Sequence, residues 1–156
     1  MAVRLNDEVV EAINNPASIK VLASVDRQGN IHNVCKGSIR TTDDGQIKLW
    51  ELLESSQSNK NLTYALWFNK EISINVITED RRSYQIKGIP VKNLNAGREY
   101  EENYIKAQEK NPKNDLAAVY FIDPTQIIEE SYPVRLEEEQ KKHPLYIHLD
   151  RVAKKD

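Results

Sequence analysis

Short runs of β-branched and apolar residues, joined by turn sequences and not by helices, most strongly constrain how this chain can fold. Residues 19–25, 31–40 and 46–52 form three such runs, with turn sequences at residues 26–30 and 42–45 between them. Apolar runs bounded by glycine, asparagine and aspartate are typical of antiparallel strands. Three of them in succession predict a β-meander and argue against a βαβ nucleotide-binding unit.

A polar segment, residues 54–61, leads from the third run into a stretch with helical spacing of its apolar residues. Ser56 or Ser58 is the expected N-cap of this helix. The first N–H groups of a helix lack partners within the helix, so a helix start can bind an anion. Serine hydroxyls and a lysine would strengthen such a site, although the serines can equally be simple caps. From this segment alone, capping is the first interpretation.

The rest of the chain adds strands and one clear helix. Residues 71–78 alternate in polarity, and residues 83–94 form a long strand whose interior Gly88 indicates a bulge or a close approach of another backbone or a ligand. Residues 98–110 are expected to form an amphipathic helix, and residues 116–122 a buried strand that ends in a turn. The sum predicts an α+β, mainly β, barrel or Greek key.

Composition excludes several classes of protein. The 156 residues carry a net charge of −2, which gives no general attraction to nucleic acid or membranes. No apolar run has the length of a membrane span, and the acidic start does not resemble a signal peptide, so we expect a cytoplasmic protein. His32, His143 and His148 lack the spacing of metal ligands, and no metal is expected. Cys35, the only cysteine, is expected to be a small buried residue.

A resemblance to a known family rests on three stretches in order: VLASVDRQGNIHNVCKGSI, SQSNKNL and SYQIKGIPV. They resemble the flavin-binding split-barrel proteins related to pyridoxamine 5′-phosphate oxidase, over about residues 15–128. The resemblance implies a six-stranded antiparallel Greek-key split β-barrel with flanking helices. It also implies a homodimer with FMN between the subunits. Residues 129–156 would be a C-terminal extension, and residues 1–156 a single FMN-binding domain.

The resemblance also implies which residues contact the cofactor. The phosphate is expected to bind the second strand and the loop before the helix, while the flavin lies along the third stretch. The residues carried over are Asn33, Val34, Cys35, Lys36, Gly37 and Ser38 on the second strand, Trp50 beside the flavin, Ser56, Gln57, Ser58, Lys60 and Asn61 in the loop, and Gln85, Lys87 and Gly88 in the third stretch. Gln57 stands where the family often has lysine or arginine, which removes one positive charge.

The resemblance implies an FMN-dependent oxidoreductase acting with a small-molecule substrate or an electron-transfer partner. No side chain stands out as a general base, which favours hydride or electron transfer over acid–base catalysis. The arginine- and tryptophan-rich C-terminal pattern of true pyridoxamine 5′-phosphate oxidases is missing, so vitamin B6 is not the expected substrate. Three alternatives remain open. The protein could be an electron carrier or redox sensor, a split barrel that binds haem or a deazaflavin, or, as Gln57 suggests, a barrel that has lost its cofactor.

Overall fold

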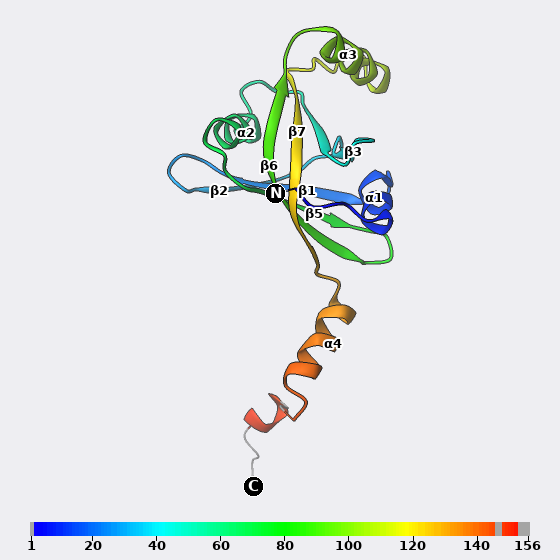
Figure 1. The fold of residues 1–156 in the computed structure, drawn as a ribbon, viewed down its shortest axis with the longest axis vertical. Helices are drawn as coiled ribbons and strands as arrows, with labels where there is room; N and C mark the ends of the chain where they lie inside the picture. Colours follow the sequence, from blue (N-terminus) through cyan, green and yellow to red (C-terminus); the bar gives the residue numbers. More distant parts are fainter. Residues whose placement is uncertain (1, 146–147, 153–156) are drawn as a thin grey trace.

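Seven strands form one curled antiparallel sheet with the order β2-β1-β5-β6-β7-β4-β3 (Figure 1). The computed structural model describes residues 2–145 and 148–152. The strands are β1 (Ile19–Val25), β2 (Ile31–Cys35), β3 (Arg40–Thr41), β4 (Ile47–Glu51), β5 (Ile72–Ile77), β6 (Ser83–Leu94) and β7 (Ala118–Glu129). The helices are α1 (Asp7–Asn14), α2 (Gln57–Phe68), α3 (Arg98–Lys110), α4 (Tyr132–Lys142) and the 3-10 helix η1 (His148–Arg151).

The expected count of six strands is wrong by one, because the run at residues 31–40 does not continue as a single strand. The Lys36 N–H still donates to Lys20 O at 2.9 Å, but the Ile39 N–H turns back to Lys36 O at 3.4 Å. Ser38 Oγ then accepts from the Trp50 N–H at 3.0 Å, which directs the chain toward β4. The residues after this turn form β3, a separate edge strand paired with β4.

The expected three-strand meander is also wrong, because β4 pairs with β7 and β3 and not with β2. All but one residue of β4 is buried, and β7 offers a run of five buried residues from Ala118. β2 is half exposed along its length and lies at the opposite edge of the sheet. Pairing with β7 therefore buries the apolar side chains of β4, which pairing with β2 would leave partly open.

β7 continues through Asp123 and Pro124 to Glu129, so the turn expected after residue 122 is absent. It pairs with β6 along its length, with register shifts between Lys87 and Gly88 and between Pro90 and Lys92. A Cβ atom on Gly88 would lie 2.6 Å from Ile122 Cγ2 and 2.8 Å from Asp123 O. The close approach expected at Gly88 is thus made by the backbone of β7.

Two apolar clusters hold the sheet and helices together. In the larger cluster, α1 contributes Val9, Ala12 and Ile13 and α2 contributes Leu62 and Ala65, all packed against the strands. The smaller cluster lies under α3, where Ala107 meets buried residues of β4, of β7 and of the segment just before β7; these are Trp50, Leu116, Val119 and Phe121. The region between β4 and α3 is therefore closely packed, and the candidate site lies at the edge of this region.

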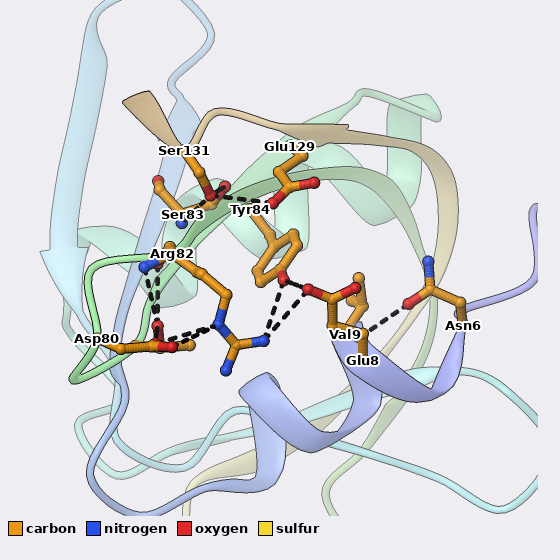
Figure 2. Close-up of polar contacts among 10 residues, drawn as sticks. Asn6, Glu8, Val9, Asp80, Arg82, Ser83, Tyr84, Glu129 and Ser131 are labelled. Carbon is orange, nitrogen blue, oxygen red and sulfur yellow. Dashed lines mark hydrogen bonds and ion pairs between the residues drawn. The ribbon is translucent and has the colours of Figure 1, made fainter. Parts of the chain in front are cut away.

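A polar cluster attaches α1 to the turn between β5 and β6. Figure 2 shows Tyr84 and Arg82 converging on Glu8: the Tyr84 hydroxyl donates to Glu8 Oε1, and Arg82 Nη1 lies 3.2 Å from the same oxygen. Arg82 also pairs with Asp80 at 3.0 Å. The hydrogen bonds from Tyr84 and Arg82 lower the pKa of the Glu8 carboxyl. Burial, with the bond to Glu8, raises the pKa of Tyr84 to about 12.

The C-terminal part projects away from the sheet as α4 followed by η1 (Figure 1). No residue of α4 is buried, and Glu137 pairs with Lys141 one turn later at 3.2 Å. An exposed charged helix is what i,i+4 pairs of this kind support. Among the helices that the structure describes, none has the length and apolar character needed to span a membrane.

Candidate functional site

A groove opens where the end of β2, the end of β4, the start of α2 and the segment after α3 meet. We call it the Trp50 groove. It has a volume of about 820 Å³ and is lined by residues 35–38, residues 50–53, Ser56, Lys110 and residues 113–115. A volume of this size is ordinary for a small-molecule or cofactor site.

The groove gathers six of the fifteen residues that the family resemblance implied for cofactor binding. They are Cys35, Lys36, Gly37, Ser38, Trp50 and Ser56. The others lie elsewhere in the chain. Gln57, Lys60 and Asn61 line a separate pocket beside the β1–β2 turn, while Asn33 and Gln85 lie on the outer face of the sheet. Within one chain, the implied contacts are therefore divided among different surfaces.

The remaining implied contacts have structural partners. Val34 packs against the main core, and Ser58, in the first turn of α2, is only 2% exposed. Lys87 Nζ lies 4.0 Å from Glu71 Oε1, and Gly88 faces the backbone of β7.

Trp50 is buried, yet it borders the groove. Its indole N–H donates to Asn103 Oδ1 on α3 at 3.1 Å, and the Arg40 guanidinium carbon lies 4.0 Å from its ring centre. Cys35 is exposed, so the expectation of a buried cysteine is wrong. Cys35 alternates with Ile31 and Asn33 on the outward side of the edge strand β2, where all three side chains reach solvent. The thiol therefore belongs to the groove lining and the outer face of the sheet.

Glu51, which sequence reasoning missed, is the most unusual residue of the groove. It is fully buried at the end of β4, and Lys36 Nζ lies 2.8 Å from its Oε2 atom. The Ser56 hydroxyl donates to the same oxygen at 3.2 Å. Its Oε1 atom is buried and has no hydrogen-bond partner among the residues that the structure describes. Ile47, Leu49 and Glu51 alternate along β4, which places this carboxylate on the inward face. The same alternation in the sequence could have predicted that Glu51 points inward.

The polar side chains at the start of α2 bind one another. Ser56 is the N-cap, as one of the two expected positions, and its Oγ accepts from the Asn59 N–H at 3.1 Å. Ser58 Oγ lies 3.2 Å from Ser56 Oγ, and Gln57 Nε2 donates to Asn61 Oδ1 at 2.8 Å. Because Glu51 already brings a negative charge to this corner and engages Lys36, the residues here do not fit the phosphate of FMN. The dianion would meet a buried carboxylate of like charge.

Metal binding has no support in the described part of the chain. Across residues 2–145 and 148–152, no three or more histidine, cysteine, aspartate and glutamate side chains are grouped so that they could hold an ion.

No protein-family model matches the sequence, and no curated protein matches it. Solved structures do match. HupZ of Group A Streptococcus superposes with a TM-score of 0.66 at 24% identity, covering 82% of this chain and 95% of HupZ. An FMN-binding protein of Syntrophomonas wolfei gives a TM-score of 0.63 at 14% identity, covering 78% and 83%. HutZ of Vibrio cholerae, described as a heme storage protein, gives 0.54 at 14% identity, covering 81% and 95%.

Putative pyridoxamine 5′-phosphate oxidases of Lactobacillus delbrueckii and Listeria innocua are among the other structures that superpose on the chain. The fold is that of the pyridoxamine 5′-phosphate oxidase-like split barrels. An F420 reductase shares it as well. Proteins with this fold are thus named for different cofactors: FMN, F420 and heme. At these sequence identities, the similarity to them concerns the fold alone.

Proposed function

We propose that this split barrel binds a redox cofactor in the Trp50 groove and transfers electrons or hydride through it. The supporting observation is the groove, which joins the end of β2, the edge of Trp50 and three lysines, Lys36, Lys110 and Lys113, in one volume of about 820 Å³. Lys110 and Lys113 form no ion pair with described residues, so both can meet an anionic group. The groove is open, which suits a small-molecule substrate or an electron-transfer partner.

FMN is the first candidate cofactor, and it fits the groove only in part. Leu52 and Leu53 offer apolar surface to a flat ring, the edge of the buried Trp50 borders them, and Lys110 and Lys113 offer positive charge nearby. The phosphate does not fit the start of α2, where Glu51 lies. Bound FMN would supply the redox chemistry, while the chain would bind and orient it and set its electrostatic surroundings.

Haem is the second candidate, and the buried Glu51 is the observation that favours it. The anionic groups of haem are carboxylates, and they do not have to bind at the start of α2, where the Glu51 carboxylate lies. Lys110, at the end of α3, and Lys113, in the segment after it, line the groove and can pair with such carboxylates. HutZ, described as a heme storage protein, has the same fold.

The absorption spectrum of the purified protein tests these proposals. The protein is examined as isolated, then after addition of FMN or of haem and removal of unbound cofactor on a desalting column. Retained flavin bands support FMN, and a retained Soret band supports haem. A protein that stays colourless after both additions contradicts the cofactor proposal. With a retained cofactor, steady turnover of an electron donor and acceptor separates an enzyme from an electron carrier or redox sensor.

We also propose that the protein is a homodimer formed through the outer face of β2, β1, β5 and β6. Ile31 is 81% exposed on this face and Ile19 is 55% exposed. Val25 lies opposite Ile31, and Ile77 lies opposite Ile19, which makes the face continuous across three strands. An open apolar sheet face is typical of an association surface. In such a dimer, Asn33 and Gln85, which also lie on this face, would approach the partner subunit.

Ile31→Asp is expected to shift the protein from dimer to monomer, raising the dimer dissociation constant by at least about 30-fold. A two-fold interface contains each substitution twice, and each new carboxylate would lose water on association. Sedimentation velocity over a range of concentrations measures the effect. Ile105→Asp is the matched control, because Ile105 is a 58% exposed isoleucine on α3. A monomeric wild-type protein, or an Ile31→Asp protein that dimerises normally, would rule this interface out.

A further inference from the structure

A second pocket lies beside the Trp50 groove, between the end of α1, the start of β1, the turn before β3 and the end of α3. We call it the Arg40 pocket. It has a volume of about 480 Å³ and shares Gly37, Ser38 and Lys110 with the groove. Among its described lining residues, the charged side chains are Lys20, Arg40 and Lys110, with no carboxylate. The pocket is therefore a cationic neighbour of the proposed cofactor site.

Arg40 has hydrogen-bond donors without acceptors in this pocket. Its Nε and Nη2 atoms are buried and have no hydrogen-bond partner among the described residues. Ser18 Oγ, also on the pocket lining, is buried without a partner as well. Buried donors are nearly always hydrogen-bonded in folded proteins, and a buried guanidinium without an acceptor is costly. These atoms indicate a missing acceptor.

Lys20 adds a buried cation to the pocket. It is 8% exposed, and its ammonium donates to Ile13 O at 3.1 Å and to Ile39 O at 2.7 Å. An ammonium has three donors, so two neutral carbonyls leave one N–H and the full charge uncompensated. Burial lowers the pKa of Lys20, and the charges of Lys110 and Arg40 lower it further.

The positive charge extends from the pocket along the sheet. Arg40 lies directly opposite Lys48 in the β3–β4 pair, and like charges in this arrangement destabilise a sheet. Burial, Arg40 and Lys106 all lower the pKa of Lys48, with Glu99 opposing them. None of these basic side chains forms an ion pair within the described part of the chain. A bound anion would relieve this repulsion.

We propose that the Arg40 pocket is an oxyanion site that accepts a phosphate or carboxylate group. Such a group would take hydrogen bonds from Arg40, Ser18 and the free N–H of Lys20, and charge-assisted bonds of this kind are the strong ones. Its source is either the anionic end of the ligand in the adjoining Trp50 groove or a free anion such as inorganic phosphate. Only the first source rests on the proposed function. The phosphate of FMN, which Glu51 would repel from the start of α2, could bind in this pocket instead.

Thermal unfolding with inorganic phosphate tests the site without any cofactor. Phosphate is titrated against sodium chloride at constant ionic strength. At about 100 times its dissociation constant, phosphate is expected to raise the Tm of the wild-type protein by about 5–10 °C. Arg40→Gln is expected to lose most of this shift, and Ser18→Ala, which changes little volume, part of it. Arg98→Gln, which removes a 93% exposed arginine side chain, should respond like the wild type.

The source of the anion is separated by comparing FMN with riboflavin, which lacks the phosphate. If the ligand supplies the anion, Arg40→Gln is expected to weaken FMN binding by at least about tenfold and to leave riboflavin binding unchanged. A phosphate-dependent Tm shift that needs Arg40, without this FMN effect, supports the site with a free anion. Equal responses of wild type and Arg40→Gln in both experiments overturn it. Failure of both flavins to bind removes FMN from the proposed function, while the phosphate titration still decides the oxyanion site.

Discussion

Lys36→Met is expected to lower the free energy of unfolding by about 3–5 kcal/mol. Lys36 is the charged partner of Glu51, with 2.8 Å between Nζ and Oε2, and the Glu51 side chain is fully buried. Removing the lysine would leave a buried carboxylate whose remaining hydrogen-bond donor is the Ser56 hydroxyl. Urea unfolding followed by tryptophan fluorescence measures the loss, and an unchanged m-value would show that the denatured state is not altered.

Two variants make this result specific to the buried pair. Lys36→Met combined with Glu51→Leu is expected to recover most of the stability, because an apolar pair of similar size often replaces a buried ion pair without net cost. Lys87→Met is the matched control, since Lys87 lies 4.0 Å from the exposed Glu71 and such surface pairs contribute about 0–1 kcal/mol. If Lys36→Met costs no more than Lys87→Met, Glu51 is not the buried anion that excludes phosphate from the start of α2.

Gly88→Ala is expected to destabilise the protein by about 3 kcal/mol, at the upper end for overpacking. The added Cβ would lie 2.6 Å from Ile122 Cγ2 and 2.8 Å from Asp123 O. The second contact is with backbone in the middle of β7, so it cannot be relieved by a side-chain rotation. β6 and β7 would have to separate where they form the longest strand pair of the sheet. The midpoint of urea unfolding reports this loss.

Gly37→Ala is the matched control for the same chemical change. Gly37 is exposed in the turn before β3, and a Cβ built on it meets nothing within 4 Å. Its stability should stay within about 0.5 kcal/mol of the wild type. If Gly88→Ala is equally mild, β7 does not approach Gly88 as closely as the structure shows. In that case, the close approach of a ligand such as a flavin would again be the explanation for a glycine at position 88.

Local elements of this protein could be predicted because the signals that define them are local. The strand at residues 83–94 and the helix at residues 98–110 have the predicted bounds, since alternation and helical spacing need only neighbouring residues. Ser56 acts as N-cap, one of the two serines expected there. The split-barrel fold is confirmed as well, from the order of three sequence stretches. FMN, the homodimer and the oxidoreductase activity stay proposals.

Strand pairing and the character of the site were decided only by the tertiary structure. The sequence shows Glu51 on the inward face of β4, but not that Lys36, fifteen residues earlier, compensates it. It places Lys20 and Arg40 in strands without showing that both line one pocket. Local patterns specify which face of a strand is buried, whereas the neighbour on that face depends on the packing of the whole sheet. For that reason a helix start that looks ready for phosphate in the sequence is filled by the protein's own carboxylate.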